Sequence, residues 1–367
     1  MNKRNILATT VAMLAMTSCA QHEKVLHECF PFTIGAAINV TMQSGGDSLS
    51  DSIVRKHYNS IVAEDCMKCE NIHPEKDKFF WDEADAFVAY GETNNMEIIG
   101  HCLIWHSQCA PWFAVGENDS LVTADELRER MREHIHTIVS RYKGRIKGWD
   151  VVNEMVEDDG SFRNSFFYQV LGEEYIYLAL QYAHEADPDA MLFLNDYNMF
   201  KEGKRKAYLN IIKEAQRRGL RLDAIGMQCH YGMDFPEWQD FEASLKAFSE
   251  SGVKVMFTEV DMNILSTIVQ GANVSDKTEY DEKMNPYVDG VPADVDQMWN
   301  TRMATFFSIV EKYSGSVIRM TSWGVTDKDS WLNNWPMKGR TNYPLWFDRK
   351  GKMKPFLVKI MEEKQKK

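Results

Sequence analysis

The chain has 367 residues, of which 44% are hydrophobic and 26% are charged, so it can bury a sizeable core and global disorder is excluded. The length suits one large barrel-type domain or two ordinary domains. The formal net charge is −12, and the only basic run is the short C-terminal stretch KQKK, which argues against a protein that binds nucleic acid through its charge.

The N-terminus has the layout of an export signal. Lys3 and Arg4 precede an apolar run that is too short for a comfortable membrane span, and Thr17, Ser18 and Cys19 follow it. Small residues before a cysteine resemble a bacterial lipobox, which implies cleavage before Cys19 and a lipid on that cysteine. We expect a signal peptide over residues 1–18 and a tether over 19–29. The protein would then be exported and lipid-anchored at a bacterial cell envelope, on the outer membrane surface or in the periplasm; an ordinary secretory signal is the alternative.

Eight short apolar, β-branched runs follow, with longer helical patterns between them. Strands that alternate with helices predict parallel βαβ units. Eight such units in a chain of this length predict an α/β fold with a single (β/α)8 TIM barrel, which we place at residues 30–362, before a charged tail at 363–367. The runs span residues 32–40, 59–64, 97–105, 146–154, 190–196, 222–230, 253–260 and 317–324.

One helix, within residues 123–144, can be predicted in detail. Thr123 is followed three residues later by Glu126, which is a capping-box pattern. Gly144 stops the helix just before the fourth run. The apolar residues that follow the cap at helical spacing are Leu127, Met131, Ile135 and Ile138.

Polar and aromatic residues stand where the apolar runs end. Active sites of barrels of this type collect at the C-terminal ends of the strands, so these side chains can converge. The run ends carry Glu64, His101 to Trp105, Asn153 and Glu154, Asn195 and Asp196, Gln228 and His230, Glu259 to Asp261, and Trp323.

Alternation along each strand predicts which of these side chains share a face, because residues two apart point the same way. The groups expected to share a face are His101, Leu103 and Trp105; Gln228 and His230; and Val255, Phe257, Glu259 and Asp261, an apolar row that ends in two carboxylates.

Glu154 and Glu259 end the fourth and seventh runs, so they can face each other across the mouth of a barrel. A single glutamate is ordinarily a solvated surface charge, but each of these two closes a run whose final apolar residues carry no charge. Two opposed carboxyl groups in a cleft with tryptophans predict glycoside hydrolysis, in which one group protonates the leaving oxygen and the other attacks the sugar or activates water.

Six motifs in this chain closely resemble those of glycoside hydrolase family 10, the endo-β-1,4-xylanases. The resemblance runs from about Phe30 to the KPF at 354–356, and the motifs fall in the order of the family. They are WDVVNE (149–154), FTEVD (257–261), GHCLIWHSQ (100–108), LNDYN (194–198), MQCHY (227–231) and SWGVTDKDSWL (322–332).

The resemblance implies retaining hydrolysis of internal bonds in xylan, through a covalent glycosyl-enzyme intermediate. It implies no cofactor and no metal, and it makes xylan and xylo-oligosaccharides the partners of a protein that we expect to be a monomer. No nucleic acid is expected, and the membrane is a partner only through the N-terminal lipid.

The resemblance also implies a role for each matching residue. Glu154 matches the acid/base and Glu259 the nucleophile. Asn153 matches the amide that hydrogen-bonds the 2-hydroxyl of the reacting sugar, and Asp261 matches the carboxylate that holds His230, which touches the nucleophile. The residues that match the remaining sugar-binding groups are Lys68, His101, Trp105, Gln228 and His230 at the reacting sugar, Glu64 and Asp65 at the next subsite, and Trp323 and Trp331 as tryptophans against sugar faces.

The chemistry sets two expectations for the pair of glutamates. Glu154 must be protonated at neutral pH, so we expect the negative charge of Glu259 to raise its pKa in the free enzyme. Glu259 must stay ionised, aided by hydrogen bonds from His230 and neighbouring amides. In a retaining enzyme the two carboxyl groups lie about 5–5.5 Å apart.

Several features depart from the family pattern or suggest other chemistry. Asp65 stands where the family usually has Asn, and a carboxylate cannot donate to a sugar hydroxyl as an amide can. The CMKC stretch at 66–69 would suit a zinc or redox site, although no second ligand pair follows it. We assign no role to Cys66, Cys69, Cys102 and Cys109. The acids of the long segment 263–295 could hold calcium, but their spacing matches no EF-hand and favours a solvated loop.

Two further functions stay open. One is a relative that acts on cellulose-type or mixed glucans or on aryl-glycosides, because the sequence does not reveal whether the pocket excludes the extra hydroxymethyl of glucose. The other is a surface glycan-binding lipoprotein with an inactive barrel. The presence of Glu154, Glu259, Asn153 and His230 argues against it.

Overall fold

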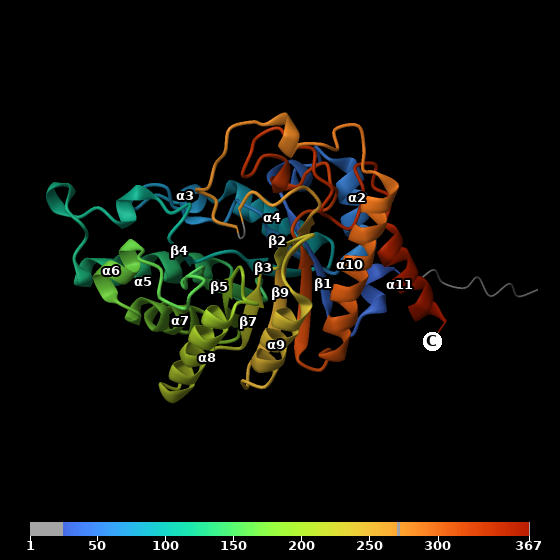
Figure 1. Cartoon of the computed structure of the whole chain (residues 1–367). Helices are drawn as coiled ribbons and strands as arrows, with labels where there is room; N and C mark the ends of the chain where they lie inside the picture. Colours follow the sequence, from blue (N-terminus) through green and yellow to red (C-terminus); the bar gives the residue numbers. More distant parts are fainter. Residues whose placement is uncertain (1–24, 270–271, 367) are drawn as a thin grey trace, which may run out of the picture.

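Eight parallel strands close into a barrel in the computed structural model, which describes residues 25–269 and 272–366 (Figure 1). The strands pair in the order β10-β1-β2-β3-β5-β6-β7-β9, and β9 pairs with β10 to complete the ring. The predicted (β/α)8 barrel is therefore confirmed. The barrel strands are β1 (Thr33–Ile38), β2 (Ser60–Ala63), β3 (Glu97–Gly100), β5 (Gly148–Asn153), β6 (Met191–Asp196), β7 (Ala224–Met227), β9 (Lys254–Asn263) and β10 (Val317–Ser322).

Two short strands extend the ladder at the C-terminal end of the barrel: β4 (Ile104–Trp105) pairs with β5, and β8 (His230–Gly232) pairs with β9. The longer helices surround the strands (Figure 1). The helices are α1 (Val40–Gln43), α2 (Ser48–His57), α3 (Cys69–Ile72), α4 (Asp82–Thr93), α5 (Ala124–Arg141), α6 (Phe166–Leu171), α7 (Glu174–Ala186), α8 (Glu202–Arg217), α9 (Trp238–Ser249), α10 (Ala293–Lys312) and α11 (Pro355–Gln365), with 3-10 turns η1 (Leu26–Cys29), η2 (Pro111–Phe113), η3 (Glu117–Asp119), η4 (Glu282–Met284) and η5 (Trp331–Asn333).

The strands are buried on both faces, which explains their nearly continuous apolar sequences. One face packs against the helices in a large outer core. The other face fills the barrel with a small inner cluster that Trp323 closes on the side of the cleft described below. Gly100 ends β3 where a Cβ atom would lie 2.1 Å from the ring of Trp149, so the close approach of this indole requires glycine. The inner cluster consists of Ala37, Val62, Ile99, Phe193, Ala224, Met256 and Trp323.

Helix α5 forms where the sequence predicts it, and the apolar residues at helical spacing are buried. The Thr123 hydroxyl accepts a hydrogen bond from the backbone N–H of Glu126 at 3.3 Å. The Glu126 side chain does not return to the cap as a capping box requires; its carboxylate pairs with Arg130 instead. The prediction of the box is therefore half right.

Both strands that lead to the predicted catalytic glutamates contain one extra residue. In β5, Asp150 pairs with Phe193 while Val152 pairs with the next residue, Leu194. In β9, Phe257 pairs with Met320, and Val260 pairs with Ser322, so three steps on β9 match two on β10. Such bulges re-aim the side chains that follow them.

The bulge in β9 makes the predicted row of Val255, Phe257, Glu259 and Asp261 wrong. Val255 and Phe257 face the helices, and Phe257 packs against Phe306 of α10 with ring centroids 5.5 Å apart. Glu259 instead lines the cleft.

The predicted alternation over residues 101–105 is also wrong at Leu103, which lies in the outer core. The reason is that β3 ends at Gly100 and pairing resumes only at Ile104, so the period of two is interrupted. The other predicted pair is confirmed, because Gln228 and His230 both line the cleft.

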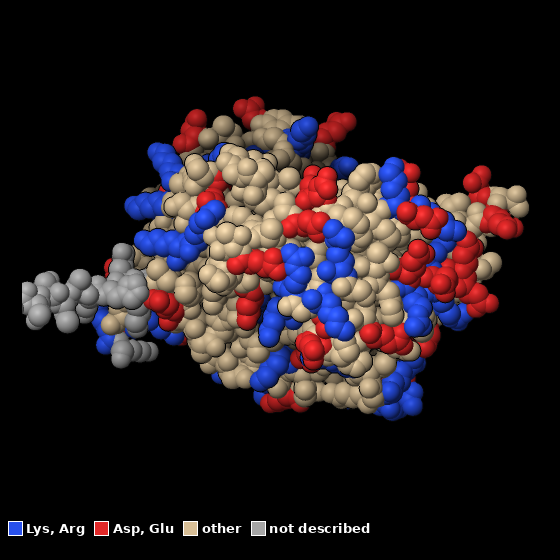
Figure 2. Space-filling view, turned by 180° about the vertical axis from the view of Figure 1, so that it is seen from behind, with Lys and Arg blue, Asp and Glu red and all other residues tan. Residues whose placement is uncertain are grey.

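The predicted signal peptide and Cys19 lie outside the described residues. Part of the expected tether is described: Leu26–Cys29 forms the turn η1, with both end residues buried. Within residues 25–269 and 272–366, no helix has the length and hydropathy needed to cross a membrane. On the face shown in Figure 2, basic and acidic side chains lie intermixed and do not form a single basic surface.

Candidate active site

A cleft of about 510 Å³ opens at the C-terminal ends of the strands. Every residue predicted to be catalytic or to bind substrate lines it, while Asp261 lies behind His230. The cleft also includes residues to which the sequence analysis gave no role, from the segment after β1, from the loop after β4 and from the long loop after β9. These additional residues are Asn39, Val40, Thr41, Gln108, Ala272 and Val274.

Glu154 follows the last residue of the bulged strand β5 and has a backbone φ of 57°. A residue other than glycine is uncommon in this left-handed region and stays there only where its surroundings hold it. The residue is 3% exposed. The Trp105 indole donates to Oε2 at 2.9 Å, and the Gln228 amide donates to Oε1 at 3.1 Å. Both direct partners of the carboxyl are therefore neutral.

The pKa of Glu154 is raised to about 7, first because the group is buried and next because Asp196 is negatively charged. Glu259 adds a smaller contribution in the same direction. The expected direction of the shift is thus found, and Glu259 contributes to it as expected, but burial and Asp196 contribute more.

Glu259 lies on β9 and faces positively charged or polar partners. His230 Nε2 lies 3.1 Å from Oε2, and the Asn195 amide donates to Oε1 at 2.8 Å. Burial alone would raise the pKa of Glu259. The hydrogen bond from His230, the charges of His101 and His230 and the Asn195 amide outweigh burial, so the pKa lies below the usual glutamate value. Glu259 is therefore ionised at neutral pH.

His230 bridges two carboxylates. Its Nδ1 lies 2.9 Å from Asp261 Oδ2, and its Nε2 faces Glu259. Burial would lower the pKa of His230, but the charge of Asp261 and the two hydrogen bonds raise it to about 10. The ring is therefore a cation that donates to both sides. Asp261 also accepts from the Trp331 indole at 2.7 Å, so this tryptophan has a structural partner besides its exposure to the cleft.

A network of amides lies between the two glutamates. Asn195 Nδ2 donates to Glu259 and contacts Asn153 Oδ1 at 3.2 Å, and Gln228 Nε2 contacts the same Asn153 oxygen at 3.1 Å. Asn153 Oδ1 is therefore occupied. Its Nδ2 has no hydrogen-bond partner within the described part of the chain, so the amide keeps a free donor at the cleft.

Lys68 lines the cleft and lies between Gln108 and Asp65. Lys68 Nζ lies 2.8 Å from Gln108 Oε1, 3.1 Å from Asp65 Oδ1 and 5.3 Å from the centroid of the Trp105 ring. Asp65 also accepts from the Gln108 amide at 3.2 Å. Burial raises the pKa of Glu64 to about 7, with Lys68 opposing it. The negative charge of Asp65 is paired with the positive charge of Lys68.

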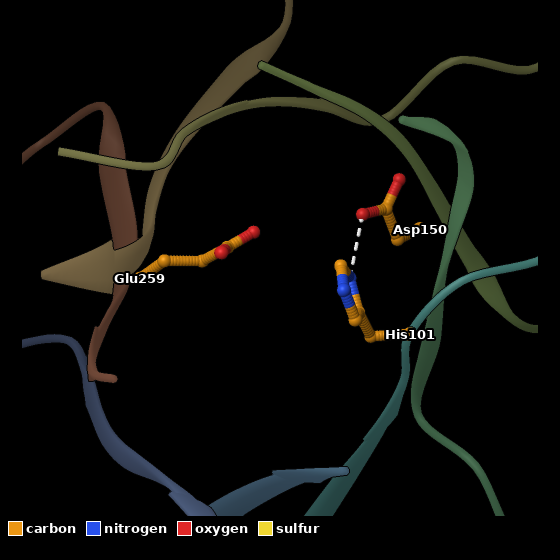
Figure 3. A group of neighbouring side chains, drawn as sticks. All are labelled: His101, Asp150 and Glu259. Atoms are coloured by element: carbon orange, nitrogen blue, oxygen red, sulfur yellow. Dashed lines mark hydrogen bonds and ion pairs between the residues drawn. The ribbon is translucent and has the colours of Figure 1, made fainter. Parts of the chain in front are cut away.

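His101, just after β3, Asp150 of β5 and Glu259 of β9 project toward the middle of the barrel (Figure 3). His101 Nδ1 lies 2.9 Å from Asp150 Oδ2. One ligand atom from each of the three lies within 4.8 Å of the others, and no other such group of at least three occurs in the described residues. Hydrogen bonds already engage Asp150 and Glu259, which is the arrangement of a buried polar network.

Asp150 was missed by the sequence analysis. It is fully buried, and it accepts from both His101 and the Asn195 amide, the latter at 3.1 Å. The available signal was a charged residue inside the apolar run 146–154, where an unpartnered carboxylate would be costly.

The cysteines do not form a metal-type group among the described residues. Five of them are free thiols: Cys66, Cys69, Cys102, Cys109 and Cys229. The Sγ atoms of Cys69 and Cys109 are 3.8 Å apart, and burial raises the pKa of Cys66 to about 12. The acids of the segment 263–295 likewise form no such group in its described part. Neither observation supports a metal site in these segments.

Comparison with known sequences identifies the family. The sequence model of glycosyl hydrolase family 10 matches residues 22–363. The chain belongs to glycosyl hydrolase family 10. This family 10 chain is 41% identical to endo-1,4-beta-xylanase A of Xylanibacter ruminicola, over 99% of both chains. It is 37% identical to the beta-1,4-xylanase of Dictyoglomus thermophilum, over 87% of this chain and 84% of that one.

Solved structures agree with the sequence relatives. A family 10 endoxylanase retrieved from a sugarcane soil metagenome is 38% identical and superposes with a TM-score of 0.88, covering 92% of this chain and 99% of that one. The protein is thus a glycoside hydrolase, as the motifs predicted, and the cleft at the strand ends is its candidate active site.

Proposed function

We propose that this family 10 glycoside hydrolase is an endo-β-1,4-xylanase that acts with retention of configuration. The observation that carries the proposal is the pair of buried glutamates at one cleft whose pKa values are driven in opposite directions. Two carboxyl groups separated in this way are suited to be an acid and a nucleophile. The relatives named above, which are called xylanases, supply the substrate class.

In the first step Glu154 gives its proton to the oxygen of the scissile bond while a carboxylate oxygen of Glu259 attacks the anomeric carbon. The bond from that carbon to the leaving oxygen breaks, the leaving sugar departs as an alcohol, and a covalent glycosyl-Glu259 ester remains. The proton is available because Glu154 has a pKa of about 7.

In the second step the ionised Glu154 takes a proton from water, and the water oxygen attacks the same carbon. The ester bond to Glu259 breaks, the sugar leaves with its original configuration, and both glutamates return to their starting forms. His230 keeps Glu259 a good leaving group, because the cation donates to its carboxylate.

Polar and aromatic groups of the cleft bind the sugars in this proposal. The free Nδ2 donor of Asn153 suits the 2-hydroxyl of the reacting sugar, and this bond strengthens as the ring flattens in the transition state. Tryptophan rings offer apolar faces against which sugars stack. The sugar-contacting residues proposed with Asn153 are Glu64, Asp65, Lys68, His101, Trp105, Gln228, His230, Trp323 and Trp331.

The test is the stereochemistry of the first product. Proton NMR of xylo-oligosaccharide hydrolysis should show the β-anomer first, with the α-anomer appearing only through mutarotation. A fluorinated xylobioside inactivator should label the peptide that contains Glu259. Initial release of the α-anomer would indicate inversion and would contradict the retaining mechanism, for which we expect a carboxyl separation of about 5–5.5 Å.

Initial rates on xylan and on carboxymethylcellulose decide between this function and a glucan-specific relative. We expect xylan to be preferred clearly. A higher rate on carboxymethylcellulose would replace the substrate but keep the mechanism. No release of reducing ends from either polymer would favour a glycan-binding protein with an inactive barrel.

We also propose that the protein is an exported, monomeric lipoprotein anchored through Cys19, because small residues precede this cysteine after an apolar run. Expression of the full chain in a bacterial host should place it in the detergent phase of a Triton X-114 partition. The Cys19→Ala variant should move to the aqueous phase. Partition of both forms into the aqueous phase would support secretion instead, and sedimentation velocity tests the monomer.

A further inference from the structure

The backbone conformation of Glu154 needs support that neither sugar-binding groups nor Glu259 provide. Asn195 O accepts from its N–H at 2.8 Å, and the Arg163 guanidinium donates to its carbonyl at 2.8 Å. Two residues later, the N–H of Val156 lies 3.3 Å from Asp196 Oδ2. The left-handed residue is thus held on both sides, and Asp196 forms part of the hold.

Asp196 ends the neighbouring strand β6 and is fully buried. The ammonium of Lys204, from α8, lies 2.6 Å from Oδ1, and the Tyr208 hydroxyl donates to Oδ2 at 2.8 Å. The backbone N–H of Tyr197 donates to Oδ1 at 2.9 Å. Both oxygens of this buried carboxylate therefore have hydrogen-bond donors, as a buried polar group requires.

We propose that Asp196, held by Lys204, is a positioning residue for Glu154: it fixes the chain just after the glutamate and supplies a negative charge that keeps the glutamate protonated. The inference rests on the proposed role of Glu154 as the acid. The raised pKa of Glu154, in which the charge of Asp196 contributes more than that of Glu259, supports it.

Other charged or titratable groups surround Glu154 and Asp196. A test must distinguish their effects on the pKa of Glu154 from the effect of Asp196. Lys204 also lies 3.9 Å from Asp158 and 3.9 Å from the centroid of the Tyr197 ring. The Arg163 guanidinium contacts the Tyr197 hydroxyl at 2.8 Å. The groups that act electrostatically on Glu154, Asp196 or this guanidinium are Glu259, Tyr197, Arg163, Glu157, Cys102, His106, Lys204, Tyr175 and Tyr208.

The experiment measures kcat/KM against pH for xylo-oligosaccharides and for 2,4-dinitrophenyl β-xylobioside. Bonds between sugars need the proton of Glu154, whereas the dinitrophenolate leaves without one. In Asp196→Asn, the basic limb for xylo-oligosaccharides should move down by about half to one pH unit, which lowers kcat/KM about 3- to 10-fold above that limb. The limb for the dinitrophenyl substrate should stay in place.

Lys204→Met is the matched control, because it breaks the same ion pair but leaves the carboxylate with Tyr208 and two backbone donors. Its basic limb should not move down. The double variant Asp196→Asn with Lys204→Met removes both buried charges, so no unpaired charge is left in the core. It can be measured even if Asp196→Asn alone unfolds, and its basic limb should show the same downward shift.

An unmoved basic limb in a folded Asp196→Asn or double variant would overturn the proposal. An equal downward shift in Lys204→Met would also overturn it. Unfolding of both Asp196 variants would assign Asp196 a purely structural role and would overturn it as well. Failure of the wild-type enzyme to cleave xylo-oligosaccharides would instead contradict the proposed function, so the two failures are distinguishable.

Discussion

Glu154 and Glu259 are both buried glutamates next to bulged strand segments, and their immediate neighbours differ in kind. Around Glu154 lie an indole and an amide, with the carboxylate of Asp196 nearby. Around Glu259 lie the His230 cation and the Asn195 amide. The same side chain is thus held neutral in one place and ionised in the other. The difference shows that the partners of each carboxyl, more than the distance between the two glutamates, set their protonation states.

The largest effect should come from removing the ionised glutamate, Glu259. Glu259→Gln cannot form the covalent ester, so we expect kcat on xylan to fall on the order of 10⁴-fold or more. Azide should not restore the rate. Reducing-end assays measure the loss, and circular dichroism checks that the fold is kept. A variant with near-wild-type activity would remove Glu259 from its proposed role.

Removing the neutral glutamate, Glu154, should lower the activity on xylan nearly as much. The loss should depend on the substrate, being large only where the leaving group needs a proton. Glu154→Gln loses general acid catalysis, which corresponds to about 10²–10⁴-fold on xylan. With 2,4-dinitrophenyl β-xylobioside the first step should survive, and a burst of dinitrophenolate should precede a slow steady state that azide accelerates. Equal losses on both substrates, without a burst, would contradict the acid/base assignment.

The pH dependence of kcat/KM reports both environments at once. Activity needs Glu154 protonated, so it should fall as pH rises through about 7. Activity also needs Glu259 ionised, so it should fall only at pH values below the usual glutamate range, since the pKa of Glu259 is lowered. Each limb should approach tenfold per pH unit. A profile whose acidic limb lies near neutrality would show that His230 does not act as the cation proposed above.

A sharper test changes the support of Glu259 alone. In Asp261→Asn the pKa of His230 should fall, so the ring loses its charge and the pKa of Glu259 rises. The acidic limb should therefore move up by about one pH unit, while the basic limb stays where Glu154 places it. Trp331→Phe, which removes the other donor to Asp261, is the control and should move the acidic limb less.

The smallest effect is expected away from both glutamates. Asp65→Asn restores the amide that the family usually has and gives the subsite a hydrogen-bond donor. We expect KM for long xylo-oligosaccharides to change by about 2- to 10-fold, as one hydrogen bond would give, with both pH limbs unmoved. A larger change in kcat than in KM would connect Asp65 to the reacting sugar.

The sequence carried the barrel and both glutamates because those features depend on patterns of several residues. Eight apolar runs separated by helical stretches are a repeated signal, and the motifs around Glu154 and Glu259 are specific to the family. Most of the residues that line the cleft were found for the same reason. Gln108 was quoted within a motif and still received no role, because its contact with Lys68 depends on how two separate loops meet.

The errors arose where a local count was extended through an irregular segment. Alternation gave the wrong face for Leu103 because the strand is interrupted, and for Val255 and Phe257 because β9 has an extra residue. The contribution of Asp196 to the raised pKa of Glu154 was missed because Asp196 approaches from another strand. A carboxylate 42 residues away in the chain cannot be weighed against Glu259 without three-dimensional distances.

The extra residues in β5 and β9 bear on how such barrels can be recombined. Consider a chimera in which this chain supplies β5 and β9 with their extra residues and a second barrel supplies the segments that follow them. The direction of each catalytic carboxylate would stay as it is in this chain, and only the walls of the cleft would be exchanged. A junction placed upstream with a partner strand one residue shorter would rotate the acid or the nucleophile toward the helices, although every catalytic residue type would still be present.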